Sequence, residues 1–139
     1  MLLKIYAGQS LSEGCDIALK SRLYVSGWTL SEMLKNIRKS SSYYGKTALF
    51  ICYEKEMPVA LCLATAYDRT DEKIYELQAF CRKNFRRLGY ASLCVKACKM
   101  FFGPEAKYVV YPGIENSNVF WNRVEIPRQT TVKFFNSYD

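Results

Sequence analysis

The sequence predicts one domain of the α/β (α+β) class, with a mixed, mostly antiparallel central sheet flanked by helices. Half of its 139 residues are hydrophobic, which is enough for a single core and argues against disorder. Apolar, β-prone runs alternate with stretches whose apolar residues recur at helical spacing. Two of the runs are joined by a short polar turn and should form an antiparallel hairpin. We therefore expect residues 1–139 to form a single domain.

The chain is expected to begin with a strand and a helix. Leu2–Tyr6 has the pattern of a short strand. Ser10 and Glu13 have the spacing of a capping box, in which each side chain binds a free backbone N–H at the start of a helix. The helix should run to about Arg22, with Gly14 inside it.

The remaining elements are expected in the following order along the chain: a second helix over 29–39 that also begins with a capping box, a loop over 40–45, strands over 46–53 and 59–67 joined by a turn over 54–58, a polar turn over 68–73, a strand over 74–82, a helix over 90–102, a strand over 107–111, a short helix over 115–123 and a last strand over 130–135.

The composition excludes several kinds of chemistry. There is no histidine, so Ser-His and Cys-His nucleophiles and the commonest metal ligand are absent, and we expect no metal site. The six cysteines form no Cys-x-x-Cys pair and lie among apolar residues, which favours buried, reduced thiols. They are Cys15, Cys52, Cys62, Cys81, Cys94 and Cys98.

The charge and hydropathy of the chain suggest its location and partners. No apolar run approaches the ~18 residues of a membrane span, and the N-terminus lacks the long apolar region of a signal peptide. We therefore expect an intracellular, cytoplasmic protein without membrane contact. The net charge of +7 favours an acidic partner, which could be a phosphorylated cofactor, a nucleic acid or an acidic protein surface.

The stretch from Phe80 to Phe102 is the centre of the functional prediction. It joins an apolar strand to an amphipathic helix through a short basic loop, and Gly103-Pro104 ends the helix. Six Lys or Arg and no Asp or Glu lie between Glu76 and Glu105. A strand that leads into a helix through such a loop presents free backbone N–H groups and the positive end of the helix dipole, and so favours an anion such as phosphate.

The loop sequence resembles that of a known family. Residues 86–91, Arg-Arg-Leu-Gly-Tyr-Ala, match the (Gln/Arg)-x-x-Gly-x-(Gly/Ala) loop with which GNAT N-acetyltransferases hold the pyrophosphate of acetyl-CoA. The expected order of strands and helices is similar to the GNAT fold along essentially the whole chain. The segment 120–126 resembles the family's aliphatic-Tyr-Glu-Lys-Leu-Gly-Phe segment, with Trp121 at the tyrosine position and Glu125 in place of the glycine.

The resemblance implies a cofactor, acetyl-CoA, and a set of residues that bind it. Backbone amides would cradle the pyrophosphate, basic side chains would add charge, and the end of the preceding strand would bind the pantetheine arm. The amides are those of Arg87, Leu88, Gly89, Tyr90, Ala91 and Ser92, the charges are those of Arg86 and Arg87 with Arg82 or Lys83 at the 3′-phosphate, and the strand residues are Phe80, Cys81 and Arg82. A solvated basic loop without ligand is the alternative.

The resemblance also implies the reaction, a direct attack of an amine on the thioester. Glu76 is the candidate proton acceptor, although the family's usual position falls on Tyr75. Neighbouring residues of a strand point to opposite faces, and a β-bulge could bring Glu76 onto the required face. A solvent-facing Glu76 is the alternative.

The proton donor to the leaving thiolate is not specified by the sequence. Trp121 stands where the family has a tyrosine, and an indole N–H is a donor but not a useful acid. Tyr108, Tyr111 and Tyr138 are substitutes among which the sequence does not choose. A GNAT-fold structural or binding module with impaired catalysis is therefore the rival interpretation.

The acceptor is expected to be an amine on a protein, an aminoacyl-tRNA or a small molecule. Basic residues between 35 and 46 interleave with Tyr43 and Tyr44, a pattern that suits RNA or another polyanion and equally the solvated face of a helix. A basic RNA-binding domain without cofactor is a third interpretation, which depends on charge alone. The sequence leaves open whether the protein forms a homodimer.

Overall fold

The computed structural model describes residues 1–23, 47–66, 73–110, 120 and 123–124. The expected helix over 29–39, the loop over 40–45, most of the turn over 68–73 and the last strand lie outside these residues. The elements are β1 (Leu2–Ala7), a 3-10 turn (Gly8–Ser10), α1 (Leu11–Lys20), β2 (Thr47–Glu54), β3 (Met57–Ala66), β4 (Ile74–Cys81), a second 3-10 turn (Lys83–Phe85), α3 (Tyr90–Phe102) and β5 (Lys107–Val110). Phe120 and Arg123 are helical, as expected for 115–123.

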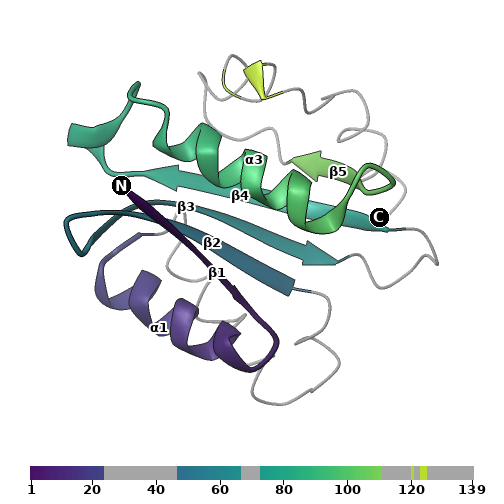
Figure 1. Ribbon diagram of the computed structural model, residues 1–139, viewed down its shortest axis with the longest axis horizontal. Coiled ribbons are helices and arrows are strands. Elements are labelled where there is room, and N and C mark those ends of the chain that lie inside the picture. Colours follow the sequence, from purple (N-terminus) through teal and green to yellow (C-terminus); the bar gives the residue numbers. More distant parts are fainter. Residues whose placement is uncertain (24–46, 67–72, 111–119, 121–122, 125–139) are drawn as a thin grey trace.

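The five strands form one sheet in the order β1-β2-β3-β4-β5. Neighbouring strands are antiparallel from β1 to β4, and β4 pairs with β5 in parallel. α3 lies along one face of the sheet and α1 along the other (Figure 1). The predicted mixed, mostly antiparallel sheet flanked by helices is therefore confirmed.

The hairpin between β2 and β3 has a tighter turn than the expected one over 54–58. Met57 and Pro58 belong to β3, so the turn consists of Lys55 and Glu56 alone. Both residues have positive φ, +50° and +72°, as two-residue hairpin turns of type I′ require. Neither is Gly, Asn or Asp, so the usual sequence signal for such a turn is missing.

The start of α1 differs from the predicted capping box. The Ser10 hydroxyl makes no cap bond to the helix. It accepts a hydrogen bond from the Ala7 N–H (3.1 Å) and donates to the Ala7 carbonyl (3.0 Å), so it closes the turn before the helix. Because the hydroxyl is used there, the capping-box prediction is wrong. The helix also ends at Lys20, and Arg22 follows with a φ of +57°.

Gly14 allows α1 to approach the sheet closely. A Cβ at this position would lie 2.6 Å from the Cβ and Cγ of Tyr6, which is closer than side-chain atoms can pack. The glycine therefore stabilises the contact between α1 and β1, although it weakens the helix by about 1 kcal/mol relative to alanine.

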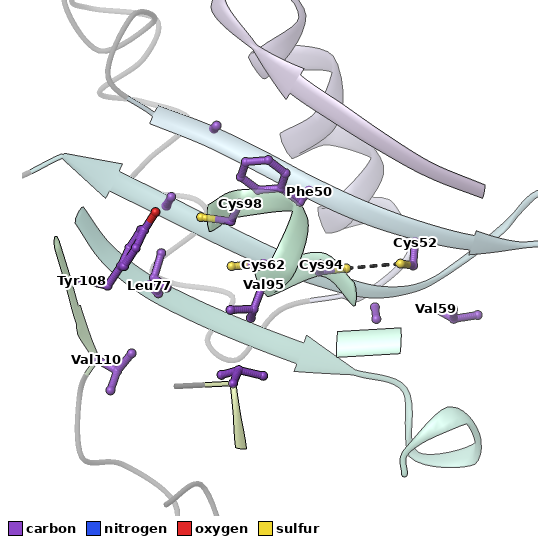
Figure 2. Packing of buried hydrophobic residues seen from close by; sticks show 14 residues of the cluster. Phe50, Cys52, Val59, Cys62, Leu77, Cys94, Val95, Cys98, Tyr108 and Val110 are labelled. Atoms are coloured by element: carbon purple, nitrogen blue, oxygen red, sulfur yellow. Dashed lines mark hydrogen bonds between the residues drawn. The ribbon is translucent and has the colours of Figure 1, made fainter. Parts of the chain in front are cut away.

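The core has two layers, one on each face of the sheet, which we call the α3 layer and the α1 layer. The buried members of the α3 layer are Ala48, Phe50, Cys52, Val59, Ala60, Cys62, Ala64, Leu77, Cys94, Val95, Cys98, Tyr108, Val110 and Val124 (Figure 2). Those of the α1 layer are Tyr6, Leu11, Cys15, Ala18, Leu23, Leu49, Ile51, Tyr53, Leu61 and Leu63. The expected burial of the cysteines is confirmed for five of them, whereas Cys81 is half-buried.

Candidate active site

The N-terminus of α3 is open to an anion. Its N-cap is Gly89, no side chain caps the helix, and its first turn contains no acidic residue. The first backbone bond at this end runs from the Leu93 N–H to the Gly89 carbonyl (3.0 Å). The N–H groups of Tyr90, Ala91 and Ser92 precede it and therefore have no acceptor within the helix. Together with the positive end of the helix dipole, they can bind a phosphate.

The loop before the helix is exposed and depends on two residues with left-handed backbone conformations. Arg87 has a φ of +67° and Gly89 a φ of +90°. Arg86, Arg87 and Leu88 are exposed, Leu88 to 66%. No atom lies within 4 Å of a Cβ built on Gly89. Glycine is needed there because of its φ, since the fold itself leaves room for a side chain.

Tyr90 ties the start of α3 to β2. Its hydroxyl donates to Oε2 of Glu54 at 2.8 Å, and its carbonyl accepts from the Cys52 thiol at 3.5 Å. Its ring packs edge-to-face on Phe85, with the ring centroids 5.9 Å apart. The conformation of the loop is therefore held by contacts on both sides of Gly89.

Arg82 anchors the beginning of the same loop. Its N–H donates to the Val59 carbonyl at 2.9 Å. Its guanidinium donates from Nε to the Pro58 carbonyl (2.8 Å) and from Nη2 to the Ser21 carbonyl (2.6 Å). These bonds tie the loop to β3 and to the end of α1. Of the two residues expected near the 3′-phosphate, Lys83 is therefore the exposed one.

The edge of β4 that faces β5 is only partly used. Lys107 N–H donates to the Lys73 carbonyl at 2.8 Å, and Arg82 N–H donates to β3. Because backbone groups alternate in direction along a strand, odd-numbered residues of β4 face β5 and even-numbered residues face β3. β5 pairs only with Ile74–Leu77. Among the described residues, the backbone groups of Ala79 and Cys81 therefore face a side without a strand.

The Arg86 side chain is hydrogen-bonded to one of these backbone groups at the edge of β4. Its Nε donates to the Cys81 carbonyl at 3.0 Å, and its guanidinium carbon lies 5.9 Å from the centroid of the Phe80 ring. The backbone of Phe80 is directed toward β3, where it is paired with Leu61. Among the described residues, the backbone N–H of Cys81 and the backbone N–H and carbonyl of Ala79 therefore remain available to a ligand at this edge. Ala79 was not among the residues predicted from the sequence to bind the cofactor, although the alternating direction of backbone groups along β4 could have identified it.

The structure separates Tyr75 and Glu76 onto opposite faces of the sheet. Tyr75 belongs to the α3 layer and stacks on Phe102, with the centroids 3.9 Å apart and the planes at 25°. Glu76 points to the α1 face and is paired with Thr65 of β3 and Val109 of β5. The pairing of β3 with β4 has no register shift from Ala60 to Ala66. The β-bulge considered for this strand is therefore not found in this stretch.

Glu76 has the environment of a proton acceptor. It is half-buried, and burial raises the pKa of its carboxyl above the ordinary value, while a hydrogen bond with the Gln78 side chain opposes that rise. Glu76 also lies next to the end of the pairing between β4 and β5, because Leu77 is the last residue of β4 that pairs with β5. A carboxylate whose pKa is shifted toward neutral pH is a better general base than an ordinary one.

Of the tyrosines considered as proton donors, only Tyr108 lies in the described part of the chain. It is buried in the α3 layer (Figure 2), and the strand register places Glu76 on the other face of the sheet. Burial raises the pKa of its hydroxyl above the usual value, which makes it a weaker acid. Tyr111, Trp121 and Tyr138 lie outside the described residues.

The described residues contain no group of three or more His, Cys, Asp or Glu arranged to hold a metal ion. They also contain no helix that is both long and apolar enough to cross a membrane.

The fold resembles that of solved acetyltransferases. The chain is similar to the aminoglycoside 6'-N-acetyltransferase AAC(6')-IG from Acinetobacter haemolyticus, with 15% identity, 92% of each chain covered and a TM-score of 0.59. It is similar to AAC(6')-Iy in complex with the bisubstrate analog CoA-S-monomethyl-acetylneamine, with 15% identity, 92% of each chain covered and a TM-score of 0.62. It is also similar to a putative acetyl transferase from Pyrococcus furiosus, with 16% identity, coverages of 88% and 90%, and a TM-score of 0.53.

No family model and no curated protein matches the sequence. At these low identities the structural likeness shows the fold. The chain therefore has the fold of the GNAT N-acetyltransferases, as its loop and its order of elements predicted.

Proposed function

We propose that the protein is an N-acetyltransferase that moves an acetyl group from acetyl-CoA to an amine. One observation carries the proposal: the β4–α3 connection joins an uncapped helix N-terminus to a strand edge whose backbone groups are not paired with any described strand. The N–H groups at the helix N-terminus can bind a pyrophosphate, and the backbone groups at the strand edge can hydrogen-bond to the amides of a pantetheine arm. AAC(6')-Iy, which shares the fold, has been solved in complex with CoA, and this supports the assignment.

The geometry of the loop supports the following assignment of residues that bind acetyl-CoA. The amides from Arg87 to Ser92 surround the pyrophosphate, and Arg86, Arg87 and Lys83 supply positive charge. Ala79 and Cys81 bind the pantetheine arm through their backbones. Arg82 holds the loop in place, because its donors are already bonded to Val59, Pro58 and Ser21.

Glu76 carries the chemistry on the acceptor side. The acceptor amine arrives as an ammonium and passes one proton to the Glu76 carboxylate, and its nitrogen then attacks the thioester carbonyl carbon. The C–N bond forms and the C–S bond breaks, so that CoA leaves as a thiolate. The second proton lost by the nitrogen goes to the thiolate or to solvent.

A binding module with impaired catalysis is the second candidate. It is favoured by the position of Tyr108, which is buried in the α3 layer, on the face of the sheet opposite to Glu76. The acceptor classes remain a protein amine, an aminoacyl-tRNA and a small amine. Because all six cysteines are free, we propose a reducing compartment, the cytoplasm.

The test has two stages. Calorimetry with acetyl-CoA and with desulfo-CoA measures binding, and we expect both to bind. Thiol release is then followed against a panel of small amines, lysine peptides and aminoacyl-tRNA, and we expect turnover with at least one class. Absence of acetyl-CoA binding would overturn the proposal altogether, whereas binding without turnover on any acceptor would establish the binding module.

A further inference from the structure

A row of polar side chains crosses the α1 face near one end of the sheet. Strand pairing places Thr47 of β2 opposite Thr65 of β3, and Thr65 opposite Glu76 of β4. Leu49 and Leu63, two positions along the same strands, pack in the α1 layer. Since side chains alternate between faces, Thr47 and Thr65 point to that face too, as Glu76 does.

One hydroxyl of this row is buried without a partner. Thr47 is 2% exposed, and its Oγ1 has no hydrogen-bond partner within the described residues. Leaving a buried hydroxyl unbonded costs about 1–3 kcal/mol. Buried polar groups in proteins are nearly always satisfied, and ordered water satisfies those that no protein group reaches.

The spacing of the row suits one water molecule. Adjacent strands lie about 4.8 Å apart, so the backbones of Thr47 and Glu76 are roughly 10 Å apart, with Thr65 between them. A threonine side chain, a glutamate side chain and one water with two hydrogen bonds of about 2.8 Å can together cover that span. The site offers the water three polar partners from three strands, and a buried water needs two to four.

We propose that a buried water molecule accepts a hydrogen bond from the Thr47 hydroxyl and donates one to the Glu76 carboxylate, with Thr65 as its third partner. Thr47 and Thr65 are then positioning residues that hold the proton acceptor through this water. The catalytic consequence rests on the proposed function of Glu76, whereas the water site itself does not.

The bound water has a definite electrostatic effect. A hydrogen bond donated to a carboxylate favours its ionised form, so it opposes the burial that raises the pKa of Glu76. The groups that face Glu76 from the described strands are Thr65, Gln78 and Val109, none of which is charged. α1 packs against β1, β2 and β3.

Thr47→Val tests the water, because valine keeps the shape and removes only the hydroxyl. If the water is present, the variant loses an anchor of the water. We then expect the pKa of Glu76, measured by carbon-13 NMR of its carboxyl, to rise further, and Tm not to increase. If Thr47 is an unbonded hydroxyl without water, Tm increases and the pKa stays unchanged, which would overturn the proposal.

Two variants serve as controls. Tyr108→Phe removes the other described buried hydroxyl without a partner, on the opposite face, so it should leave the pKa of Glu76 unchanged whatever its effect on Tm. Thr47→Ser keeps the hydroxyl and should behave like the wild type. If Thr47→Val does not fold, Thr65→Val tests the same water from the middle strand, and the same rise in the pKa of Glu76 is expected.

A high-resolution crystal structure gives the direct answer. Density for a water within hydrogen-bond distance of Thr47 Oγ1 supports the proposal, and a dry site overturns it. In thiol-release assays, the acid limb of the pH–rate profile should move to higher pH in Thr47→Val. If the wild type has no turnover, the proposed function fails while the NMR and crystallographic results still decide the water site.

Discussion

The two ends of the candidate site, the proposed cofactor end and the proposed acceptor end, are built from different kinds of chemical group. The cofactor end consists of backbone groups, namely the free N–H groups at the start of α3 and the open edge of β4. The acceptor end consists of side chains, Glu76 with Thr65 and Thr47, held side by side by strand register. A backbone site depends on conformation and tolerates many side chains, whereas a side-chain site depends on single functional groups.

This contrast predicts which property, cofactor binding or rate, a substitution at each end of the site should change. Substitutions at the cofactor end should weaken binding only where they disturb φ or the contacts that hold the loop. Substitutions at the acceptor end should leave acetyl-CoA binding intact and change the rate or its pH dependence. The following changes test this division, from the largest expected effect to the smallest.

Glu76→Gln should lower kcat by ~10²-fold or more, the usual contribution of a positioned general base. The amide keeps the shape of the carboxylate, so calorimetry should give the same affinity for acetyl-CoA. Glu13→Gln, on the exposed side of α1, is the matched control and should change neither quantity. Wild-type turnover in Glu76→Gln would show that another group accepts the proton, and reduced acetyl-CoA binding would break the division between the two ends.

Gly89→Val should reduce acetyl-CoA affinity by about 30-fold, which corresponds to ~2 kcal/mol. Valine is strained at a φ of +90°, so the loop must move and its N–H groups lose their common direction. Gly103→Val also places a valine at a strained positive φ, +89°, but at the other end of α3. Calorimetry should then show that both variants lose stability and that only Gly89→Val loses affinity. Equal affinities would refute the cofactor site.

The sequence predicted the uncapped N-terminus of α3 and the basic loop before it, because a backbone feature of this kind leaves a local signal. The Gly89 spacing, the basic loop and the following amphipathic helix identified the α3 N-terminus. The five described strands were placed to within two residues for the same reason, since their apolar patterns are local. The tight turn at Lys55 and Glu56 was missed, because neither residue is typical of the positive φ that it adopts.

The acceptor end could not be predicted in the same way. Whether Glu76 or Tyr75 faces the α1 layer depends on register and on the absence of a bulge, which are properties of the paired strands. Thr47 and Thr65 are 18 positions apart in the sequence, and nothing local marks either of them. The role of Arg82 was also hidden, because its partners Pro58 and Ser21 lie far away along the chain.

Tyr90→Phe should raise the KM for acetyl-CoA by about threefold and leave kcat unchanged. The variant loses the hydrogen bond to Glu54 but keeps the ring contact with Phe85, so the loop is loosened rather than displaced. Glu54→Gln should have a similar or smaller effect. Tyr6→Phe breaks the buried hydroxyl pair with Tyr53 on the opposite face, so it should lower Tm without changing the KM. An effect on kcat alone would contradict a role in holding the loop.

The smallest expected effect is on stability. Its pH dependence should distinguish the acceptor end, which titrates, from the cofactor end, which does not. Burial raises the pKa of Glu76 in the folded state above its value of about 4.5 in the unfolded chain. The folded state therefore holds the proton more tightly, and this contribution to stability is complete below about pH 4.5 and is lost as the pH rises through the folded-state pKa. At neutral pH the folded protein holds a partly buried charge that glutamine avoids.

Glu76→Gln should therefore have a higher Tm than the wild type at pH 7.5, and the two proteins should converge at about pH 4, where both side chains are neutral. Gly89→Val should be less stable than the wild type by the same amount at both pH values, because backbone strain does not titrate. Thermal unfolding of the three proteins across this range measures both trends. A Tm difference between Glu76→Gln and the wild type that does not change with pH would mean that the carboxyl is not desolvated by folding. Glu76 would then lack the desolvation that distinguishes it from a solvent-facing residue of a strand.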